Sequence, residues 1–369
     1  MPEINDLPPT RVTIDLGKRS YPIDIGASLL DSLADNLPKA VESSRFYVVT
    51  DDQVGPLYLE ALKSGIPLAD IYTLPAGEGS KNLDHWQRIC TQFLSAGITR
   101  KDAVVALGGG VVGDIAGFAA ASIMRGTHFI QIPTTLLAQV DSAVGGKTAV
   151  NTTFGKNLIG SFYQPQWVLS DTKTLNTLPD RQMRAGYGEV LKYALIDNPA
   201  FFEWLETHAG DVLNRSPKHL NNAIAVSCRA KADIVTRDET EQGARALLNL
   251  GHTFAHALEA EAGYDGRLLH GEAVLMGMDM ALAASVHFGL APDRDLTRLR
   301  EHYDAYNLWP DYKIAGTPAE LLGRMKHDKK HDAKTMTFIL MRGIGQAFIC
   351  RERNAAEIED FLAQYLKAR

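Results

Sequence analysis

The sequence predicts an α/β domain with a mostly parallel sheet over residues 1–180, followed by a mainly α-helical domain over residues 181–369. Three observations lead to this prediction. Short apolar runs alternate with helical patterns in the first half, a glycine-rich turn follows one of these runs, and long helical patterns prevail after residue 180. Strands that alternate with helices are typical of parallel sheets covered by helices on their faces. A chain of 369 residues also corresponds to about two domains.

The elements are predicted in the following order. A hairpin opens the chain, because apolar and polar residues alternate over 12–16 and over 21–25, with a glycine at the start of the segment between them. A helix with apolar residues at Leu83, Trp86, Ile89 and Phe93 ends near Gly97. Further strands are predicted at 46–50, 71–74, 103–107 and 129–132. After residue 180 the helices are interrupted by one hairpin, at 336–349.

The composition excludes several classes of protein. A net charge of -6 argues against a nucleic-acid partner, which needs a basic surface. The longest apolar stretch, 103–124, contains Asp114 among several glycines, which argues against a membrane span. Three widely spaced cysteines form no disulfide framework, and the first residues lack the pattern of a signal peptide. We therefore expect a cytoplasmic protein without a nucleic-acid or membrane partner.

The segment after the strand at 103–107 matches G-x-G-x-x-G through Gly108, Gly110 and Gly113. Such a turn lets backbone N–H groups and a helix N-terminus approach a pyrophosphate, as in a Rossmann-like dinucleotide site. A tight turn that only allows close packing is the alternative. The acid expected about 20 residues later is missing, and Asp51, at the end of an earlier strand, is the better candidate for a ribose hydroxyl.

A second polar segment spans residues 144–160. Gly146-Lys147-Thr148 resembles the end of a P-loop, but position 141, where the first glycine is required, is an aspartate, so a kinase or ATPase site is excluded. Asp141, Lys147, Lys156 and Asn157 instead form a polar cluster in a loop rich in glycine and threonine. This loop is a candidate anion site, and a solvated loop without function is the alternative.

The segment 245–256 combines polar and apolar residues at helical spacing. We predict that it forms one helix, in which Arg245, Asn249, His252 and His256 fall within an arc of about 60°. A solvated helix face usually carries Lys and Glu. We therefore interpret this face as the wall of a polar pocket, with a hydrogen-bonded network in the core as the alternative.

Histidines and a glutamate suggest a metal site. His252 and His256 have the i, i+4 spacing of zinc ligands but lack the glutamate of H-E-x-x-H. His270 and Glu189 complete a possible set of two histidines and one carboxylate, which is common in open catalytic zinc sites. The spacing does not decide whether His252 or His256 is the ligand. Three lysines are further cationic candidates: Lys192, at i+3 from Glu189, Lys231 and Lys334.

Together these motifs resemble the 3-dehydroquinate synthase family, which belongs to the sugar-phosphate cyclases. The matching stretches follow the family's order and are residues 108–114, 131–148, 155–157, 186–192, 245–256 and 270–274. The resemblance implies that zinc, or cobalt, is bound by Glu189, His252 and His270, and that His256 belongs to the substrate pocket. It implies that NAD is held by Asp51, Glu78, Lys81, Gly110, Val111, Val112, Gly113, Asp114, Thr134 and Thr135, with contributions from Lys147 and Lys156.

The resemblance also implies the substrate and the assembly. The residues that match substrate contacts are Asp141, Lys147, Lys156, Asn157, Lys192, Lys231, Arg245, Asn249, His256 and Lys334. Arg125 matches an arginine that reaches the neighbouring subunit's site, which implies a homodimer. The implied reaction converts 3-deoxy-D-arabino-heptulosonate 7-phosphate into 3-dehydroquinate and phosphate in the shikimate pathway, by transient oxidation with NAD, phosphate elimination, re-reduction and aldol closure.

Three other functions compete with this interpretation. A sister cyclase would use the same NAD and metal chemistry on another sugar phosphate. A metal-dependent NAD alcohol or polyol dehydrogenase would release NADH and would not need the six cations Lys147, Lys156, Lys192, Lys231, Arg245 and Lys334. A metal-stabilised binding protein would not need an open set of three ligands.

Overall fold

The computed structural model describes residues 9–241, 243–328 and 336–368. Its contacts divide the chain into two units. The first unit contains Met1–Pro179 and Arg215–Thr240, and the second contains Asp180–Asn214 and Glu241–Arg369. The chain first passes from one unit to the other at residue 180, the predicted boundary. It then returns to the first unit over residues 215–240, whereas the prediction had a single boundary.

The centre of the first unit is a seven-stranded sheet in the order β1-β2-β9-β6-β5-β3-β4. All neighbouring strands are parallel except β1 and β2, which form the predicted opening hairpin. The strands are β1 (Thr10–Ile14), β2 (Tyr21–Gly26), β3 (Phe46–Asp51), β4 (Leu68–Leu74), β5 (Ala103–Gly108), β6 (His128–Pro133) and β9 (Trp167–Asp171). The predicted mostly parallel sheet is therefore confirmed.

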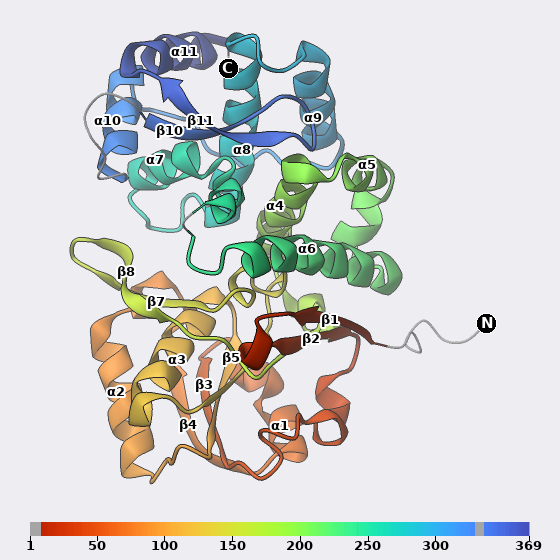
Figure 1. The fold of residues 1–369 in the computed structure, drawn as a ribbon, viewed down its shortest axis with the longest axis vertical. Helices are drawn as coiled ribbons and strands as arrows, with labels where there is room; N and C mark the ends of the chain where they lie inside the picture. Colours follow the sequence, from red (N-terminus) through yellow and green to blue (C-terminus); the bar gives the residue numbers. More distant parts are fainter. Residues whose placement is uncertain (1–8, 242, 329–335, 369) are drawn as a thin grey trace. The chain divides into compact units, whose positions relative to one another are not determined.

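Helices cover both faces of this sheet. α2 (Leu83–Ser95) and α3 (Gly110–Ser122) pack on one face, and α1 (Gly55–Gly65) packs on the other (Figure 1). Along β3, Tyr47 and Val49 contribute to the first core, whereas Phe46 and Val48 contribute to the second. Because successive side chains enter opposite cores, the strand is apolar at every position from 46 to 49, which is why this part of its sequence is a continuous apolar run.

Helix α6 (Pro217–Arg237) belongs to the first unit because its buried residues meet that unit's own segments. Cys228 Sγ donates to the backbone oxygen of Gln139 at 3.3 Å, and Lys231 Nζ donates to that of Asp141 at 2.7 Å. The sequence of α6 shows an amphipathic helix but does not state which core receives its apolar face.

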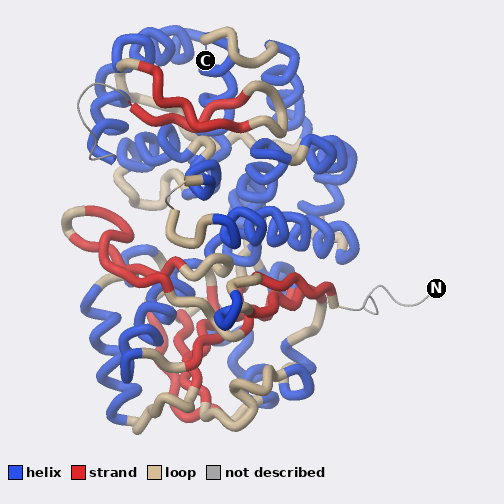
Figure 2. Tube along the Cα trace, viewed as in Figure 1, coloured by secondary structure: helices blue, strands red, loops and turns tan. Residues whose placement is uncertain are grey.

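Residues 144–160 do not form the predicted loop. They include most of a hairpin in which β7 (Lys147–Thr152) pairs antiparallel with β8 (Gly155–Phe162). Figure 2 colours this hairpin red, as it does all strands. Val150 is fully buried in the core below α3. A Cβ at Gly160 would lie 2.0 Å from the backbone oxygen of Thr148, so the pairing needs a glycine there. Gly160 therefore reflects close strand packing, whereas Gly145, Gly146 and Gly155 have a positive φ.

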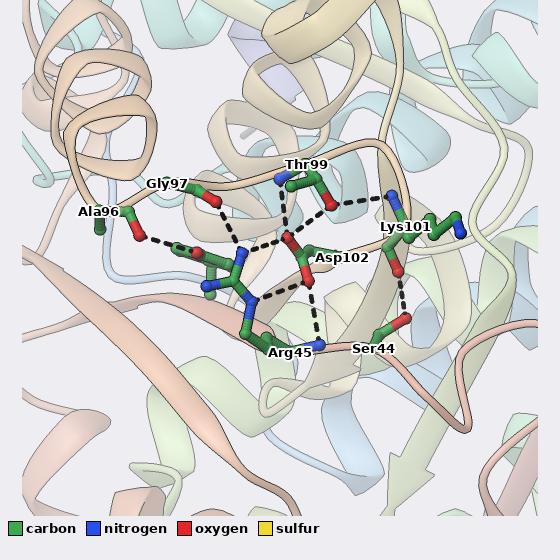
Figure 3. A network of polar contacts seen from close by, with 8 residues as sticks. Ser44, Arg45, Ala96, Gly97, Thr99, Lys101 and Asp102 are labelled. Atoms are coloured by element: carbon green, nitrogen blue, oxygen red, sulfur yellow. Dashed lines mark hydrogen bonds and ion pairs between the residues drawn. The ribbon is translucent and has the colours of Figure 1, made fainter.

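A polar network joins the start of β3 to the loop before β5 (Figure 3). Asp102 accepts hydrogen bonds from Arg45 Nε at 3.2 Å, Arg45 Nη2 at 2.9 Å and the backbone N–H of Thr99 at 2.7 Å. Ser44 Oγ donates to the backbone oxygen of Lys101 at 2.6 Å. Burial alone would raise the pKa of Asp102, but these hydrogen bonds outweigh burial and lower it below its ordinary value of 3.8.

Replacement of Asp102 by alanine is expected to lower the free energy of unfolding at pH 7 by about 2 kcal/mol, because several hydrogen bonds to one buried carboxylate are lost together. The pKa of Asp102 is lower in the folded state, so its contribution is complete above pH 4 and is lost as the pH falls through the depressed pKa. Urea unfolding at pH 7 and at pH 3 tests this. A difference between wild type and variant that is the same at both pH values would contradict it.

The second unit is mainly helical and is built around α8 (His270–His287), whose residues 271–285 are all buried. The other helices are α4 (Asp180–Asp197), α5 (Pro199–Leu213), α7 (His252–Ala262), α9 (Asp293–Ala305), α10 (Pro318–Asp328) and α11 (Ala355–Ala368). β10 (Met336–Met341) pairs antiparallel with β11 (Ala347–Arg353), which confirms the predicted late hairpin. Among the described residues, every helix is too short or too polar to cross a membrane.

Candidate functional site

Three potential metal ligands converge in the second unit. Glu189 lies on α4, His252 is the first residue of α7 and His270 is the first residue of α8. Glu189 Oε1 lies 4.0 Å from His252 Nε2 and 3.8 Å from His270 Nε2. The three ligand atoms all lie within 4.8 Å of one another, so one ion can contact all of them.

Each of these residues is next to a glycine at a close helix contact. A Cβ at Gly188 would lie 2.9 Å from the backbone oxygen of Gly271, and a Cβ at Gly271 would lie 2.0 Å from that of Ala185. Gly251 has a φ of +78°, and its Cβ would lie 2.8 Å from the backbone nitrogen of Met278. The absence of side chains at these positions lets α4, α7 and α8 approach closely enough for the three ligands to meet.

The histidine rings are oriented through their Nδ1 atoms. His252 Nδ1 lies 3.1 Å from the backbone oxygen of Leu250, and His270 Nδ1 lies 3.1 Å from Glu259 Oε2. Both partners are acceptors, so each Nδ1 carries the proton. In the neutral rings, Nε2 therefore presents a lone pair towards Glu189.

The electrostatics of the two histidines differ. Burial and the nearby Lys192 ammonium lower the pKa of His252 well below its ordinary value, so this ring is neutral, as a metal ligand must be. Burial also acts to lower the pKa of His270, but the hydrogen bond and the charge of Glu259, together with the charge of Glu189, outweigh burial and raise that pKa. The carboxylate that orients His270 therefore also stabilises positive charge at this ring.

The surroundings of Glu189 fit a bound cation. The side chain is fully buried, and among the described residues no donor makes a hydrogen bond to Oε1. Lys192, also buried, forms an ion pair with Oε2 from the next helical turn. A buried carboxylate oxygen without a donor is costly unless a cation contacts it. Two imidazoles and one carboxylate are a ligand set that suits zinc and leaves a position open.

The predicted polar helix face is wrong, because Arg245, Asn249, His252 and His256 do not lie on one helix. Arg245 and Asn249 lie on η8 (Ala244–Asn249), a short 3₁₀ helix, and α7 begins only after Gly251. The left-handed conformation of Gly251 breaks the helix. His256 lies near His252, with ring centroids 5.6 Å apart, but it is outside the group of three ligand atoms.

In the first unit, the candidate dinucleotide residues lie at the carboxyl ends of the strands. Asp51 ends β3, the glycine turn joins β5 to α3, and Thr134 follows β6. The chain places β4 on one side of β3 and the next strand, β5, on the other side. The pair β3 and β5 is therefore the topological switch point, and open α/β sheets bind ligands at such a point.

The contacts of the glycine turn support its packing role as well. A Cβ at Gly108 would lie 2.6 Å from Val112 Cγ2, and a Cβ at Gly110 would lie 3.0 Å from Ser142 Oγ. The turn therefore combines close packing with an accessible helix N-terminus, and Gly110, Val111, Val112 and Gly113 form the first turn of α3. The Oγ1 of Thr134 is buried, and no described residue makes a hydrogen bond to it.

Polar side chains predicted for the cofactor form two contacts beside this turn. Lys81, which is buried, forms an ion pair with Asp114 on α3. Burial raises the pKa of Asp114, and the Lys81 ammonium opposes this effect. Glu78 Oε1 accepts a hydrogen bond from Asn151 Nδ2 at 2.7 Å, which connects η4 (Glu78–Ser80) with β7.

Asp141 and Lys231 are also brought together. Lys231 Nζ on α6 lies 2.7 Å from Asp141 Oδ1 and 2.7 Å from the backbone oxygen of Asp141. Asp141 lies on η6 (Ala138–Ser142), a short π-helix, a feature that is frequent at functional sites.

The remaining candidates are dispersed over surface elements or lie outside the described chain. Lys147 lies on β7, and Lys156 and Asn157 lie on β8. Asn157 has a φ of +56°, and its N–H donates to Asn151 Oδ1 at 3.0 Å.

Arg125 is exposed at the end of η5 (Ile123–Arg125), also with a positive φ. Thr135 Oγ1 accepts from the N–H of Ala138 at 3.2 Å. Lys334 lies outside the described residues.

Comparison with known families identifies the chain. The family model for the 3-dehydroquinate synthase N-terminal part matches residues 71–185, and the model for the 3-dehydroquinate synthase C-terminal part matches residues 186–331. The chain belongs to the 3-dehydroquinate synthase family. Among curated relatives, the 3-dehydroquinate synthase of Rhodospirillum rubrum is 49% identical over 356 residues, which is 94% of this chain and 92% of the relative.

Solved structures of other cyclases have the same fold as this 3-dehydroquinate synthase family member. A 2-deoxy-scyllo-inosose synthase in complex with carbaglucose-6-phosphate, NAD+ and Co2+ is 28% identical, with a TM-score of 0.86, and the match covers 96% of this chain and 100% of that one. A 2-epi-5-epi-valiolone synthase from Streptomyces hygroscopicus with NAD+ and Zn2+ is 29% identical, with a TM-score of 0.85 and coverage of 95% and 97%.

Two acidic residues at the candidate site of this family member were not found from the sequence. Glu259 follows His252 by two helical turns but contacts His270, which is 11 residues further on. Glu241 Oε1 accepts a hydrogen bond from Asn249 Nδ2 at 2.8 Å. Glu259 follows His252 by seven residues and His256 by three, which places all three on the same face of α7. This spacing could have identified Glu259 as a candidate from the sequence. Glu241 lies in a non-helical segment where spacing gives no such signal.

Proposed function

We propose that this chain is a 3-dehydroquinate synthase that converts 3-deoxy-D-arabino-heptulosonate 7-phosphate into 3-dehydroquinate and phosphate. The observation that carries this proposal is the 49% identity to a curated 3-dehydroquinate synthase over 94% of the chain. The cyclases with other products that share the fold are only 28% and 29% identical. The difference in identity favours the 3-dehydroquinate reaction over that of a sister cyclase.

The proposed function requires NAD and a divalent ion. When bound, NAD supplies a reversible hydride acceptor, and zinc or cobalt supplies a Lewis acid for a substrate oxygen. We assign the ion to Glu189, His252 and His270, whose geometry and burial fit it. We assign the NAD site to the switch point of the sheet, with Asp51 for the ribose and the first turn of α3 for the pyrophosphate.

The chain's own cations are assigned to the substrate. A phosphate dianion and a carboxylate need several positive groups, which a protein of net charge -6 must supply locally. The assigned residues are Lys147, Lys156, Lys192, Lys231, Arg245 and Lys334. The two hydrogen bonds to Asp141 fix the Lys231 ammonium before substrate binds, which reduces the entropy lost on binding. Asn157, Asn249 and His256 are assigned to the polar contacts that orient the sugar.

We further propose that the enzyme is a cytoplasmic homodimer in which Arg125 contributes to the neighbouring subunit's substrate site. Two properties support a role of Arg125 beyond its own subunit. Its side chain is exposed, and its backbone, like that of Met124, has a positive φ, which costs energy in residues other than glycine. The three described cysteines are all free, as expected in a reducing compartment.

One assay tests the proposed reaction. Purified protein with NAD and zinc is given the heptulosonate phosphate, and phosphate release is followed together with the absorbance of NADH. We expect one phosphate per substrate consumed and no lasting NADH, because the same cofactor donates its hydride back within each turnover.

Two outcomes of this assay would contradict the proposal. Steady accumulation of NADH would identify a dehydrogenase. No phosphate release from this substrate, together with turnover of another sugar phosphate, would identify a sister cyclase.

A further inference from the structure

The two candidate histidine ligands differ in the group that holds their second ring nitrogen. His252 Nδ1 donates to a neutral backbone oxygen, that of Leu250, at 3.1 Å. His270 Nδ1 donates to the Glu259 carboxylate, also at 3.1 Å. The second hydrogen bond is charge-assisted and therefore stronger. Among the described residues, the His270 ring is thus held by a carboxylate, whereas the His252 ring is held by a backbone oxygen.

Glu259 is placed for this contact by the helix that also carries His252. It lies on the same face of α7, two turns further on, and its side chain is only 6% exposed. Residue 263, a glycine with a φ of +76°, ends α7, and the chain then returns to begin α8 at His270. Helix α7 therefore supplies one candidate ligand directly and orients the other through Glu259.

The charge of Glu259 also matters at this site. Lys192 forms a buried ion pair with Glu189, so its ammonium offsets the charge of the only carboxylate among the three ligands. A positive charge near the ligands weakens the attraction for a divalent cation, and this effect is strong in a buried site. Glu259 adds a negative charge close to the ligands without occupying a coordination position.

We propose that Glu259 is a positioning residue for the metal. It holds the His270 ring so that Nε2 presents its lone pair to the ion, and its charge offsets that of Lys192. This inference rests on the proposed metal site but not on the proposed substrate. A residue that accepts a hydrogen bond from the second ring nitrogen of a histidine ligand typically increases metal affinity by 10-fold to 100-fold.

The test compares Glu259→Ala and Glu259→Gln with the wild type. Zinc affinity is measured by competition with a chelator, in the absence of NAD and substrate. We expect Glu259→Ala to weaken zinc binding by about 10-fold to 100-fold. Glu259→Gln is expected to lose less, because its amide oxygen still accepts from His270 Nδ1 but carries no charge. The Co2+ absorption spectrum is expected to change in Glu259→Ala, because His270 is no longer held in one orientation.

Asp279→Asn is the matched control. Asp279 is a fully buried carboxylate on α8 that accepts from Arg300 Nε at 2.8 Å and from the Tyr365 hydroxyl at 2.6 Å. Its replacement is expected to lower the melting temperature but to leave zinc affinity and the Co2+ spectrum unchanged. This control separates a general loss of stability from an effect on the ligand.

The outcomes distinguish this inference from the proposed function. Wild-type zinc affinity in Glu259→Ala, or an equal loss in Glu259→Ala and Asp279→Asn, would overturn the role of Glu259 even if the enzyme acts on the heptulosonate phosphate. The expected losses would support that role even if the wild type bound zinc and failed to convert this substrate. A wild type that binds no divalent ion would overturn both proposals.

Discussion

His252→Ala is expected to abolish tight metal binding and turnover, whereas His256→Ala is expected to retain the metal and lose turnover. The two histidines are one helical turn apart on α7, but only His252 Nε2 lies with Glu189 and His270 in the group of three ligand atoms. Loss of one of three ligands should cost on the order of 3 kcal/mol of metal-binding free energy, or about a hundredfold in affinity. Metal content after dialysis and the phosphate-release rate measure the two effects.

The comparison within this pair is the control, because both changes remove an imidazole from the same helix. His256→Ala is expected to reduce turnover by about a hundredfold through loss of substrate orientation, with the metal content of the wild type. Circular dichroism of both variants verifies that the overall helix content is that of the wild type. Equal loss of metal in the two variants would show that the ligand has been assigned to the wrong residue.

The fold of the first unit could be predicted from the sequence because its strands have a simple signature. β3 and β5 are buried on both faces, so they appear as uninterrupted apolar runs that no surface helix would contain. The hairpin β7–β8 was missed for the opposite reason. Most of β8 is exposed, and its sequence mixes polar residues with glycines, so it lacks both the apolar run and the regular alternation.

The candidate metal ligands could be chosen from the sequence only as a set. Spacing related Glu189 to Lys192 within one helix, and the structure has this ion pair. Spacing could not separate His252 from His256, because the separation depends on where α7 begins. That point is set by the left-handed conformation of Gly251, which packs against α8 at Met278. Glu259 was missed because its contact with His270 crosses from one helix to the next.

Gly271→Ala is expected to destabilise the second unit by about 3 kcal/mol and to weaken metal binding. A Cβ at this position would lie 2.0 Å from the backbone oxygen of Ala185, and neither group can move without shifting α8 from α4. Overpacking of this kind typically costs 1–3 kcal/mol, and more where backbone must move. Because His270 is the neighbouring residue and Glu189 lies on α4, the same shift separates two of the three ligands.

Gly323→Ala is the matched control, because Gly323 lies on α10 and a Cβ there would meet no atom within 4 Å. An alanine in a helix is favoured over glycine, so this variant is expected to gain about 0.5–1 kcal/mol of stability. Gly188→Ala, with a nearest backbone contact of 2.9 Å, is expected to fall between the two. Urea unfolding and zinc titration of the three variants give this order. A Gly271→Ala protein that matched the wild type in both would mean that the helices do not need this close contact to bring the ligands together.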